Sequence, residues 1–204
     1  MSENITVYVG DLPDNLSFKG EVAVDTETMG LNLHRDRLCL VQLSSGDGTA
    51  CLVQIKQGIP CPNLCRLLTD ESVLKIFHFA RFDVAKILHD LKVEVKPIYC
   101  TKIASKLCRT SSASHSLKSL CFDLLGITLV KEQQTSDWGV DILTHEQISY
   151  AANDVLYLHQ LKEKLDVLLE REQRTELAQS CFNFLGTRGK LDLLDFDEPD
   201  IFSH

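Results

Sequence analysis

The sequence has no block of lysine or arginine residues, and its 204 residues carry a net charge of −8 at pH 7. Proteins that follow long nucleic acids usually present a basic groove, which replaces the counterions of the phosphates. The composition therefore argues against a surface of that kind. It leaves two interpretations open: the protein does not bind nucleic acid, or it binds a short stretch through a few focused contacts and metal ions.

Long apolar runs are also missing, because no segment approaches the roughly 20 residues that span a bilayer. The chain begins Met1-Ser2-Glu3-Asn4, without the basic-then-apolar order of a signal peptide. We therefore expect no membrane partner and a cytoplasmic location.

The eight cysteines give little support for disulfides, because most of them lie inside apolar segments. In a cytoplasmic protein, such residues are expected to be reduced and buried thiols. Cys61 and Cys65 form the one close pair. No CxxC motif and no neighbouring histidine pair supplies the further ligands that a zinc site needs.

Five runs rich in β-branched and apolar residues predict strands. The segment Ser45-Gly-Asp-Gly48 between the second and third runs has the composition of a hairpin turn. We therefore expect the first three runs to form an antiparallel meander. The predicted strands cover residues 21–27, 37–44, 49–55, 73–79 and 98–101.

Apolar residues at helical spacing predict four helices. The first carries Val84, Ile87, Leu88 and Leu91, and the second runs from Leu117 to Leu125 and is closed by Gly126. A capping box at residues 144–147 opens a long third helix. The fourth carries Ala178, Cys181, Phe182 and Leu185, and we expect it to stop at Gly186.

We find no repeat, low-complexity stretch or linker, and we therefore predict one α/β domain over residues 1–204. Its core covers about residues 20–165, and residues 166–204 form a C-terminal helix and an acidic tail. We expect the tail, from Asp192 to His204, to be loosely ordered.

Four carboxylates stand out from the pattern. Asp25 and Glu27 are two residues apart at the end of a predicted strand, so both project from one face of it. Two like charges at that spacing repel each other unless a cation or a proton neutralises them. Asp83 lies in the first turn of a helix that follows a buried strand, and Asp154 lies within a helix four residues after Tyr150. Aspartate is a poor residue inside a helix, which suggests a functional task.

These residues resemble the three motifs of the DEDD exonuclease superfamily. The motifs are Val24-Asp-Thr-Glu27, Phe82-Asp83 and Tyr150-Ala-Ala-Asn-Asp154, and the tyrosine matches the DEDDy branch, which contains ribonuclease D. Further stretches, in order along residues 20–165, are similar to ribonuclease D. They are Val41-Gln-Leu43, Thr101-Lys-Ile-Ala104, Ser116-Leu-Lys-Ser-Leu120, Leu129-Val-Lys131 and Ser136-Asp-Trp138.

The resemblance implies a ribonuclease H-like (DnaQ-like) fold, with a central mixed sheet of about five strands flanked by helices. It also implies two divalent cations, Mg²⁺ or Mn²⁺, which suit a site of hard oxygen ligands. Asp25, Glu27 and Asp154 would hold one ion. Asp25 would bridge to the second ion with support from Asp83. Tyr150 would orient the attacking water.

Substrate-contacting positions follow from the same resemblance. Met29 and Leu31 fall where the family wedges apolar side chains against the terminal bases, although ordinary loop packing explains them equally well. Trp138 could stack on a base or cover the core beneath a loop. Phe79 departs from the broader family, which often has asparagine there. The predicted substrate-binding residues are Thr26, Met29, Gly30, Leu31, His78, Phe82, Lys131 and Trp138.

The short chain most resembles the small bacterial nano-RNase C type, which degrades very short RNA. That resemblance implies a short single-stranded RNA substrate and a homo-oligomer, an octamer by family likeness. The apolar side chains that could form subunit contacts are Phe182, Phe184, Phe196 and Phe202. The alternative for them is packing in the core of their own chain, and its place on a helical stripe favours this alternative for Phe182.

Two alternatives remain open. Because the metals contact only phosphate and no residue reports on a 2′-hydroxyl, the substrate is DNA in one alternative, as in a proofreading or repair exonuclease. In the other, the chain is an inactive module of the same fold that binds nucleic acid. The complete carboxylate set and Tyr150 argue against the second alternative.

Overall fold

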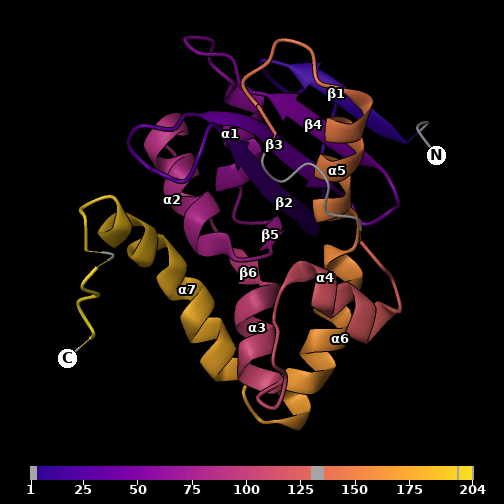
Figure 1. Cartoon of the computed structure of the whole chain (residues 1–204), viewed down its shortest axis with the longest axis vertical. Coiled ribbons are helices and arrows are strands. Elements are labelled where there is room, and N and C mark those ends of the chain that lie inside the picture. The colour runs from indigo at the N-terminus through magenta and orange to yellow at the C-terminus, as the bar shows by residue number, and fades with distance from the viewer. Residues whose placement is uncertain (1–3, 130–135, 197, 204) are drawn as a thin grey trace.

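The computed structural model describes residues 4–129, 136–196 and 198–203. Within these ranges, six strands form one mixed sheet in the order β1-β4-β3-β2-β5-β6 (Figure 1). The strand β2 is antiparallel to β3 and β3 to β4, whereas β1–β4, β2–β5 and β5–β6 are parallel pairs. The strands are β1 (Ile5–Val9), β2 (Glu21–Thr28), β3 (Leu38–Ser44), β4 (Ala50–Gln54), β5 (Leu74–Phe77) and β6 (Ile98–Cys100).

The predicted meander is confirmed in strands β2, β3 and β4. Gly46 and Gly48 adopt positive φ values of 78° and 85° in the turn between β3 and β4, a conformation that glycine adopts without steric cost. The strand β1 was not predicted. It is an edge strand whose side chains are only partly buried, and it pairs with β4, where Ile5 lies opposite Ala50. The run Ile5–Val9 is β-branched and aromatic, so it carries a strand signal that our prediction missed, whereas its pairing with the distant β4 has no local signal.

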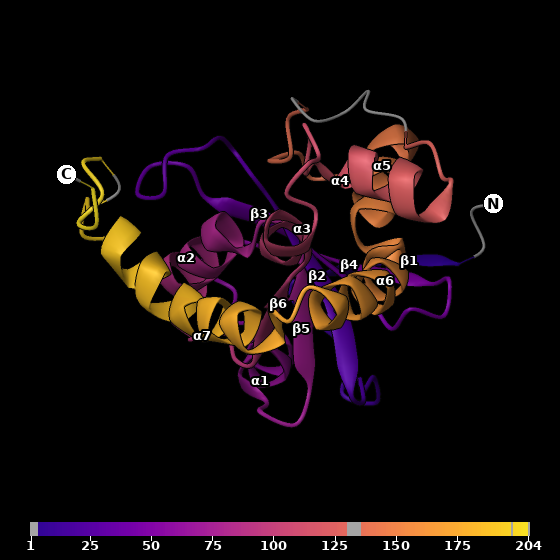
Figure 2. The same ribbon diagram turned by 90° about the horizontal axis from the view of Figure 1, so that it is seen from below.

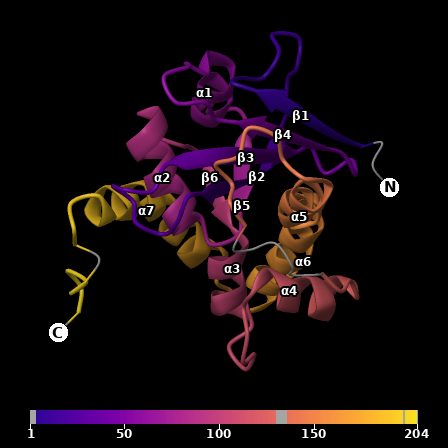
Figure 3. The same ribbon diagram turned by 45° about the horizontal axis from the view of Figure 1, so that its top comes forward.

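The helices lie on both sides of the sheet. The helix α5 packs against β2, β3 and β4 (Figure 3), and α7 runs beside α2 (Figure 2). The helices are α1 (Pro62–Thr69), α2 (Ala80–Leu91), α3 (Thr101–Cys108), α4 (Leu117–Leu120), α5 (His145–Leu156), α6 (Leu158–Arg171) and α7 (Thr175–Asp192), with a π-helical turn η1 (Cys121–Leu125) after α4. None of the described helices combines the length and apolar character needed to cross a membrane.

Two predicted helix ends are confirmed. Gly126 closes η1 with a φ of 71°. The Thr144 side chain accepts a hydrogen bond from the Gln147 backbone, and the Gln147 side chain accepts one from the Thr144 backbone, as a capping box requires. The predicted long third helix is divided at Tyr157, where α5 ends and α6 begins.

The prediction that Gly186 ends the last helix is wrong, because α7 continues to Asp192. A glycine costs about 1 kcal/mol within a helix, and packing against α2 offsets this cost. At Gly189 the two helices come close together. A Cβ there would lie 3.3 Å from the backbone of Ala85, so a glycine allows α7 to approach α2.

The prediction of a loosely ordered tail from Asp192 onward is also wrong at its first residue. Asp192 is the last residue of α7 and is only 7% exposed. It accepts hydrogen bonds from Arg81 at 2.7 and 2.8 Å, and from Arg188 at 2.6 and 2.9 Å. An acidic residue that appears to begin a solvated tail therefore fixes the end of α7 to the start of α2.

Candidate active site

Three of the four predicted carboxylates meet between β2 and α5. Asp25 and Glu27 project from one face of β2, and Asp154 comes from α5, which packs on that strand. One oxygen from each of these three residues lies within 4.8 Å of the others. Carboxylate oxygens at this separation are a suitable donor set for a hard divalent cation.

Asp83 is fixed beside this group by a residue of the opposite strand face. Thr26 lies between Asp25 and Glu27, so its side chain points to the other side of β2. There its hydroxyl donates a 2.5 Å hydrogen bond to Asp83 at the start of α2, and both side chains are buried. Thr26, predicted as a substrate contact, thus also holds Asp83 in place.

Gln42 is a site residue that our sequence analysis did not single out. It lies opposite Asp25 in the β2–β3 pair, is fully buried, and donates from Nε2 to Asp25 Oδ2 at 3.2 Å. A buried amide that orients a carboxylate is a typical outer-shell support of a metal site. The signal was available, since Gln42 is the one amide in the otherwise apolar run Leu38–Leu43.

Burial and mutual repulsion disfavour the charged forms of these carboxylates. Burial raises the pKa of Asp25 well above its usual value, and the charges of Asp83, Asp154 and Glu27 raise it further. The pKa of Glu27 is raised to about 9 by burial, then by Asp154 and Asp83. Burial raises the pKa of Asp83 to about 7, although hydrogen bonds from Thr26 oppose the shift. Divalent cations would relieve this repulsion, so the donor set fits them.

These pKa shifts predict how stability depends on pH and Mg²⁺. A carboxylate whose folded-state pKa is raised stabilises the metal-free protein below its unfolded pKa, and this stabilisation is lost as the pH rises through the folded pKa. For Glu27 the window runs from 4.5 to about 9. Since cations compete with protons, we expect Mg²⁺ to raise the Tm more at about pH 8.5 than at about pH 6. Thermal unfolding with and without Mg²⁺ measures this difference.

Glu27→Gln supplies the control for that experiment, because the amide cannot titrate. In this variant the Tm gain from Mg²⁺ should be smaller and should depend less on pH. If Mg²⁺ leaves the wild-type Tm unchanged at both pH values, the result would contradict a cation site at this position.

Tyr150 lies half-buried on α5, one turn before Asp154. Burial raises the pKa of its hydroxyl above the usual range, and the charges of Asp154, Glu27 and Asp25 add to this effect. The phenol is therefore protonated at neutral pH. A protonated hydroxyl beside the carboxylates is suited to orient a water molecule by hydrogen bonding rather than to remove its proton.

The loop after β2 presents apolar side chains beside the carboxylates. Met29 is 50% exposed and Leu31 is 84% exposed. A Cβ at Gly30 would lie 2.4 Å from Asp36 Oδ2, so a larger residue here would displace the Asp36 side chain from its place in the loop. The structure thus places all three predicted contacts on one loop, at the C-terminal end of the strand that carries Asp25 and Glu27.

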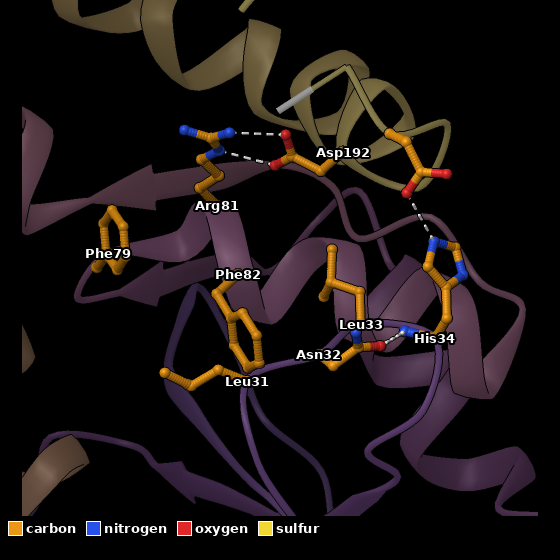
Figure 4. Close-up of a pocket in the computed structure, with 9 residues that line it drawn as sticks. Leu31, Asn32, Leu33, His34, Phe79, Arg81, Phe82 and Asp192 are labelled. Atoms are coloured by element: carbon orange, nitrogen blue, oxygen red, sulfur yellow. Dashed lines mark hydrogen bonds and ion pairs between the residues drawn. The ribbon is translucent and has the colours of Figure 1, made fainter. Parts of the chain in front are cut away.

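A cavity of about 280 Å³ adjoins this loop (Figure 4). Leu31 and Phe82 line it from the loop and from α2, and Arg81 and Asp192 form its rim toward α7. Phe82, a predicted substrate contact, therefore shares a surface with Leu31. Arg81 also lies here, but its guanidinium is engaged with Asp192 at 2.7 Å.

Phe79 ends the loop before α2 with a φ of 69°, a left-handed conformation in which asparagine is far commoner than phenylalanine. Its ring is 47% exposed and lies 4.0 Å from the Lys102 ammonium. This conformation suits asparagine, which the family resemblance led us to expect here, and Phe79 adopts it with an aromatic side chain.

Three other predicted contacts have different outcomes. His78 lies at the end of β5, where its Nδ1 is 2.9 Å from Thr101 Oγ1. Trp138 is 3% exposed and belongs to a buried cluster with Leu40, Leu52 and Ala151, which supports the core-covering interpretation, and its base-stacking role stays a prediction. Lys131 falls outside the described residues.

Comparison with protein-family models and with curated proteins identifies relatives of this chain. A family model described as 3′-5′ exonuclease matches residues 9–170. Ribonuclease D of Bartonella henselae is 32% identical over 154 residues, which cover 76% of this chain and 38% of that protein. DNA polymerase I of Aquifex aeolicus is 35% identical over 162 residues, which cover 77% of this chain and 26% of that protein. The chain therefore spans about two fifths of the ribonuclease D length and a smaller part of the polymerase.

A solved structure of Brucella melitensis NrnC matches over the whole of both chains. The two proteins are 52% identical, the match covers 100% of each, and the TM-score is 0.95. The same Brucella protein has also been solved bound to pGG and with bound Mg²⁺. Ribonuclease D-like exonucleases share this fold, so the predicted ribonuclease H-like architecture is confirmed, with one strand more than expected.

Proposed function

Because this chain belongs to the 3′-5′ exonuclease family, we propose that it removes nucleotides from the 3′ end of short RNA and releases nucleoside 5′-monophosphates. One observation carries this proposal: Asp25, Glu27 and Asp154 converge from β2 and α5 to within 4.8 Å. Asp83 lies beside them on α2, held by Thr26. The match to Brucella NrnC along the full chain supports the same assignment.

The carboxylates would hold two divalent cations, Mg²⁺ or Mn²⁺. When bound, such cations stabilise negative charge on the attacking and leaving oxygens of an in-line displacement at phosphorus. Asp25 is suited to contact both ions, because its charge interacts with each of Asp83, Asp154 and Glu27. The Gln42 amide would orient Asp25 through its hydrogen bond. The Tyr150 hydroxyl would position the attacking water.

Short RNA is the substrate that the comparisons favour, since Brucella NrnC was solved with pGG. The likeness to DNA polymerase I of Aquifex aeolicus keeps a DNA substrate as the second candidate. An inactive binding module is disfavoured, because the described site retains its three clustered carboxylates, Asp83 and Tyr150.

Substrate length provides the test of this function. Protein is incubated with labelled two-, five- and twenty-nucleotide RNA and DNA, with and without Mg²⁺. We expect Mg²⁺-dependent release of 5′-monophosphates, with faster turnover of the dinucleotide than of the twenty-mer, because metals and one apolar loop reach only the last few nucleotides. A preference for twenty-mers would contradict the length assignment but not the exonuclease assignment. A preference for DNA would select the second candidate.

The proposal further treats residues 1–204 as one exonuclease domain that acts in the cytoplasm. The eight cysteines are free, which suits a reducing compartment. Phe182 is 3% exposed and its ring centroid lies 4.6 Å from that of Tyr99, so the core packing that the helical stripe favoured for this residue is confirmed.

Assembly is a separate prediction. Phe184, Phe196 and Phe202 are 37%, 46% and 73% exposed near the C-terminus, and such apolar surface favours subunit contacts. We expect a closed homo-oligomer larger than a dimer, and by family likeness an octamer. Light scattering at micromolar concentration measures the mass. Phe202→Ser should shift the population toward smaller species, whereas a monomeric wild type would contradict the prediction.

A further inference from the structure

Leu31 needs an external support, because its own side chain has little contact with the protein. It is 84% exposed, so core packing does not fix its position. The loop around it is compact. Met29 donates from its backbone N–H to the Arg37 carbonyl at 3.1 Å, and the Asn32 N–H donates to Asp36 Oδ2 at 3.0 Å. These hydrogen bonds tie the two sides of the loop together, so the points where the loop is attached to the fold help to set the position of Leu31.

Lys86 on α2 provides such an attachment. Its side chain is 1% exposed, and its Nζ donates to the Leu33 carbonyl, two residues from Leu31, at 2.9 Å. The same ammonium contacts Asp90 Oδ1 at 2.9 Å. The other carboxylate oxygen, Asp90 Oδ2, accepts the Leu38 backbone N–H at 2.6 Å. The Lys86–Asp90 pair therefore holds the loop at two points, near Leu31 and at the start of β3.

Stability alone explains this ion pair poorly. Lys86 is buried, whereas the Asp90 side chain is 17% accessible, so the ammonium bears the larger desolvation cost. An ion pair that binds specific backbone groups is better explained by the geometry that it imposes. Here that geometry relates α2 to the loop that carries Leu31.

The helix α2 also carries Asp83, so the pair connects two parts of the site. Asp83, Lys86 and Asp90 are spaced i, i+3 and i+7 and lie along one side of the helix. Val84 and Ile87 anchor α2 in the core. The Leu31 loop is therefore joined to the carboxylate site twice, along the chain through β2 and across the fold through Lys86 on α2.

We propose that Lys86 is a positioning residue that fixes Leu31 relative to Asp83, and so sets how the last two bases of the substrate are held for cleavage. This inference rests on the proposed exonuclease function and adds a determinant of dinucleotide recognition. It assigns no direct substrate contact to Lys86, whose side chain is enclosed by the loop and α2.

The test compares Lys86→Met with wild type on two substrates in Mg²⁺. One is a 5′-phosphorylated diguanosine dinucleotide, and the other is the 4-nitrophenyl ester of thymidine 5′-monophosphate, which has a single base. We expect kcat/KM for the dinucleotide to fall about 10-fold, because misplacement far from the reacting atoms is costly in an oriented site. The nitrophenyl ester should change by less than about twofold.

The double mutant with Leu31→Ala decides whether Lys86 acts through Leu31. If it does, Lys86→Met should change dinucleotide cleavage by less than about twofold in the Leu31→Ala background. Hydrogen exchange gives a readout independent of activity, and amides of residues 31–38 should exchange faster in Lys86→Met. An equal loss on both substrates, or a full 10-fold loss in the Leu31→Ala background, would overturn the proposal.

Lys75 offers a matched control. It is a fully buried lysine on β5 whose Nζ donates to the carbonyls of Asp70, Val73 and Lys96 at 2.6, 2.7 and 2.5 Å, away from the Leu31 loop. Lys75→Met should lower the Tm without changing the ratio of the two substrates.

A milder variant covers the case in which Lys86→Met does not fold. Asp90→Asn then takes its place in the comparison with Leu31→Ala. We expect the same pattern of kcat/KM losses at smaller size. Losses that add in the double mutant of Asp90→Asn and Leu31→Ala would overturn the proposal. If wild type cleaves neither substrate, the proposed function fails, which is distinguishable from failure of the Lys86 inference.

Discussion

Replacing Asp25 with alanine should lower kcat by about 10⁴-fold, the scale observed when one member of a catalytic group that acts as a unit is removed. Asp25 is the carboxylate whose pKa is raised by the charges of all three others, Asp83, Asp154 and Glu27. Its loss would therefore remove the carboxylate that we propose to be shared by both cations. Single-turnover cleavage of a labelled dinucleotide in Mg²⁺ measures the loss.

The fold should survive the same change. Asp25→Ala removes a carboxylate that is repelled by its neighbours, so the Tm of the metal-free protein should not fall. The exposed Glu71, whose side chain is 72% accessible, supplies a control: Glu71→Ala should keep wild-type kcat. EDTA should inactivate the wild type as strongly as the Asp25 substitution. Equal cleavage by the wild type with and without EDTA would rule out a metal-dependent mechanism.

Tyr150→Phe should lower kcat by about 10²-fold, within the range of a residue that manages a proton or a water in the transition state. Phenylalanine keeps the ring that packs 6.0 Å from Trp138 and removes only the hydroxyl. Since the hydroxyl is assigned to the attacking water and not to the nucleotide, KM should change little. Steady-state kinetics on the dinucleotide separates the two parameters.

The matched control for Tyr150→Phe is Tyr99→Phe. Tyr99 also has a largely buried ring, and its hydroxyl donates to Asp166 at 2.8 Å, on the α6 side of the molecule. This variant should lose stability and keep kcat. A kcat in Tyr150→Phe that equals the wild-type value would make Tyr150 a packing residue only.

Most of the site was predictable from the sequence because its signals are local. Asp25 and Glu27 share a strand face through a period of two, and Tyr150 and Asp154 share a helix face through a spacing of four. The capping box at Thr144 fixes where that helix begins. The family motifs then related these separate patterns to one chemistry, although they did not show that Asp83 is held through Thr26.

The incorrect predictions have a common cause, which is that burial depends on partners distant in the chain. Gly186 looked like the end of the last helix, but packing against α2 carries α7 on to Asp192. Asp192 looked like the start of a solvated tail until α7 carried it to Arg81. For each residue, a contact with a segment distant in the chain reversed the expectation from the local sequence.

The sequence by itself determined the meander, the helix caps and the identity of the carboxylates, because turn chemistry, capping and side-chain periodicity act over a few residues. Only the tertiary structure decided the edge strand β1, the passage of α7 through Gly186 and Gly189, and the attachment of the Leu31 loop to Lys86. These features join segments separated by tens of residues, and their free energy comes from packing and buried hydrogen bonds. No local pattern in the chain encodes which distant surface will supply them.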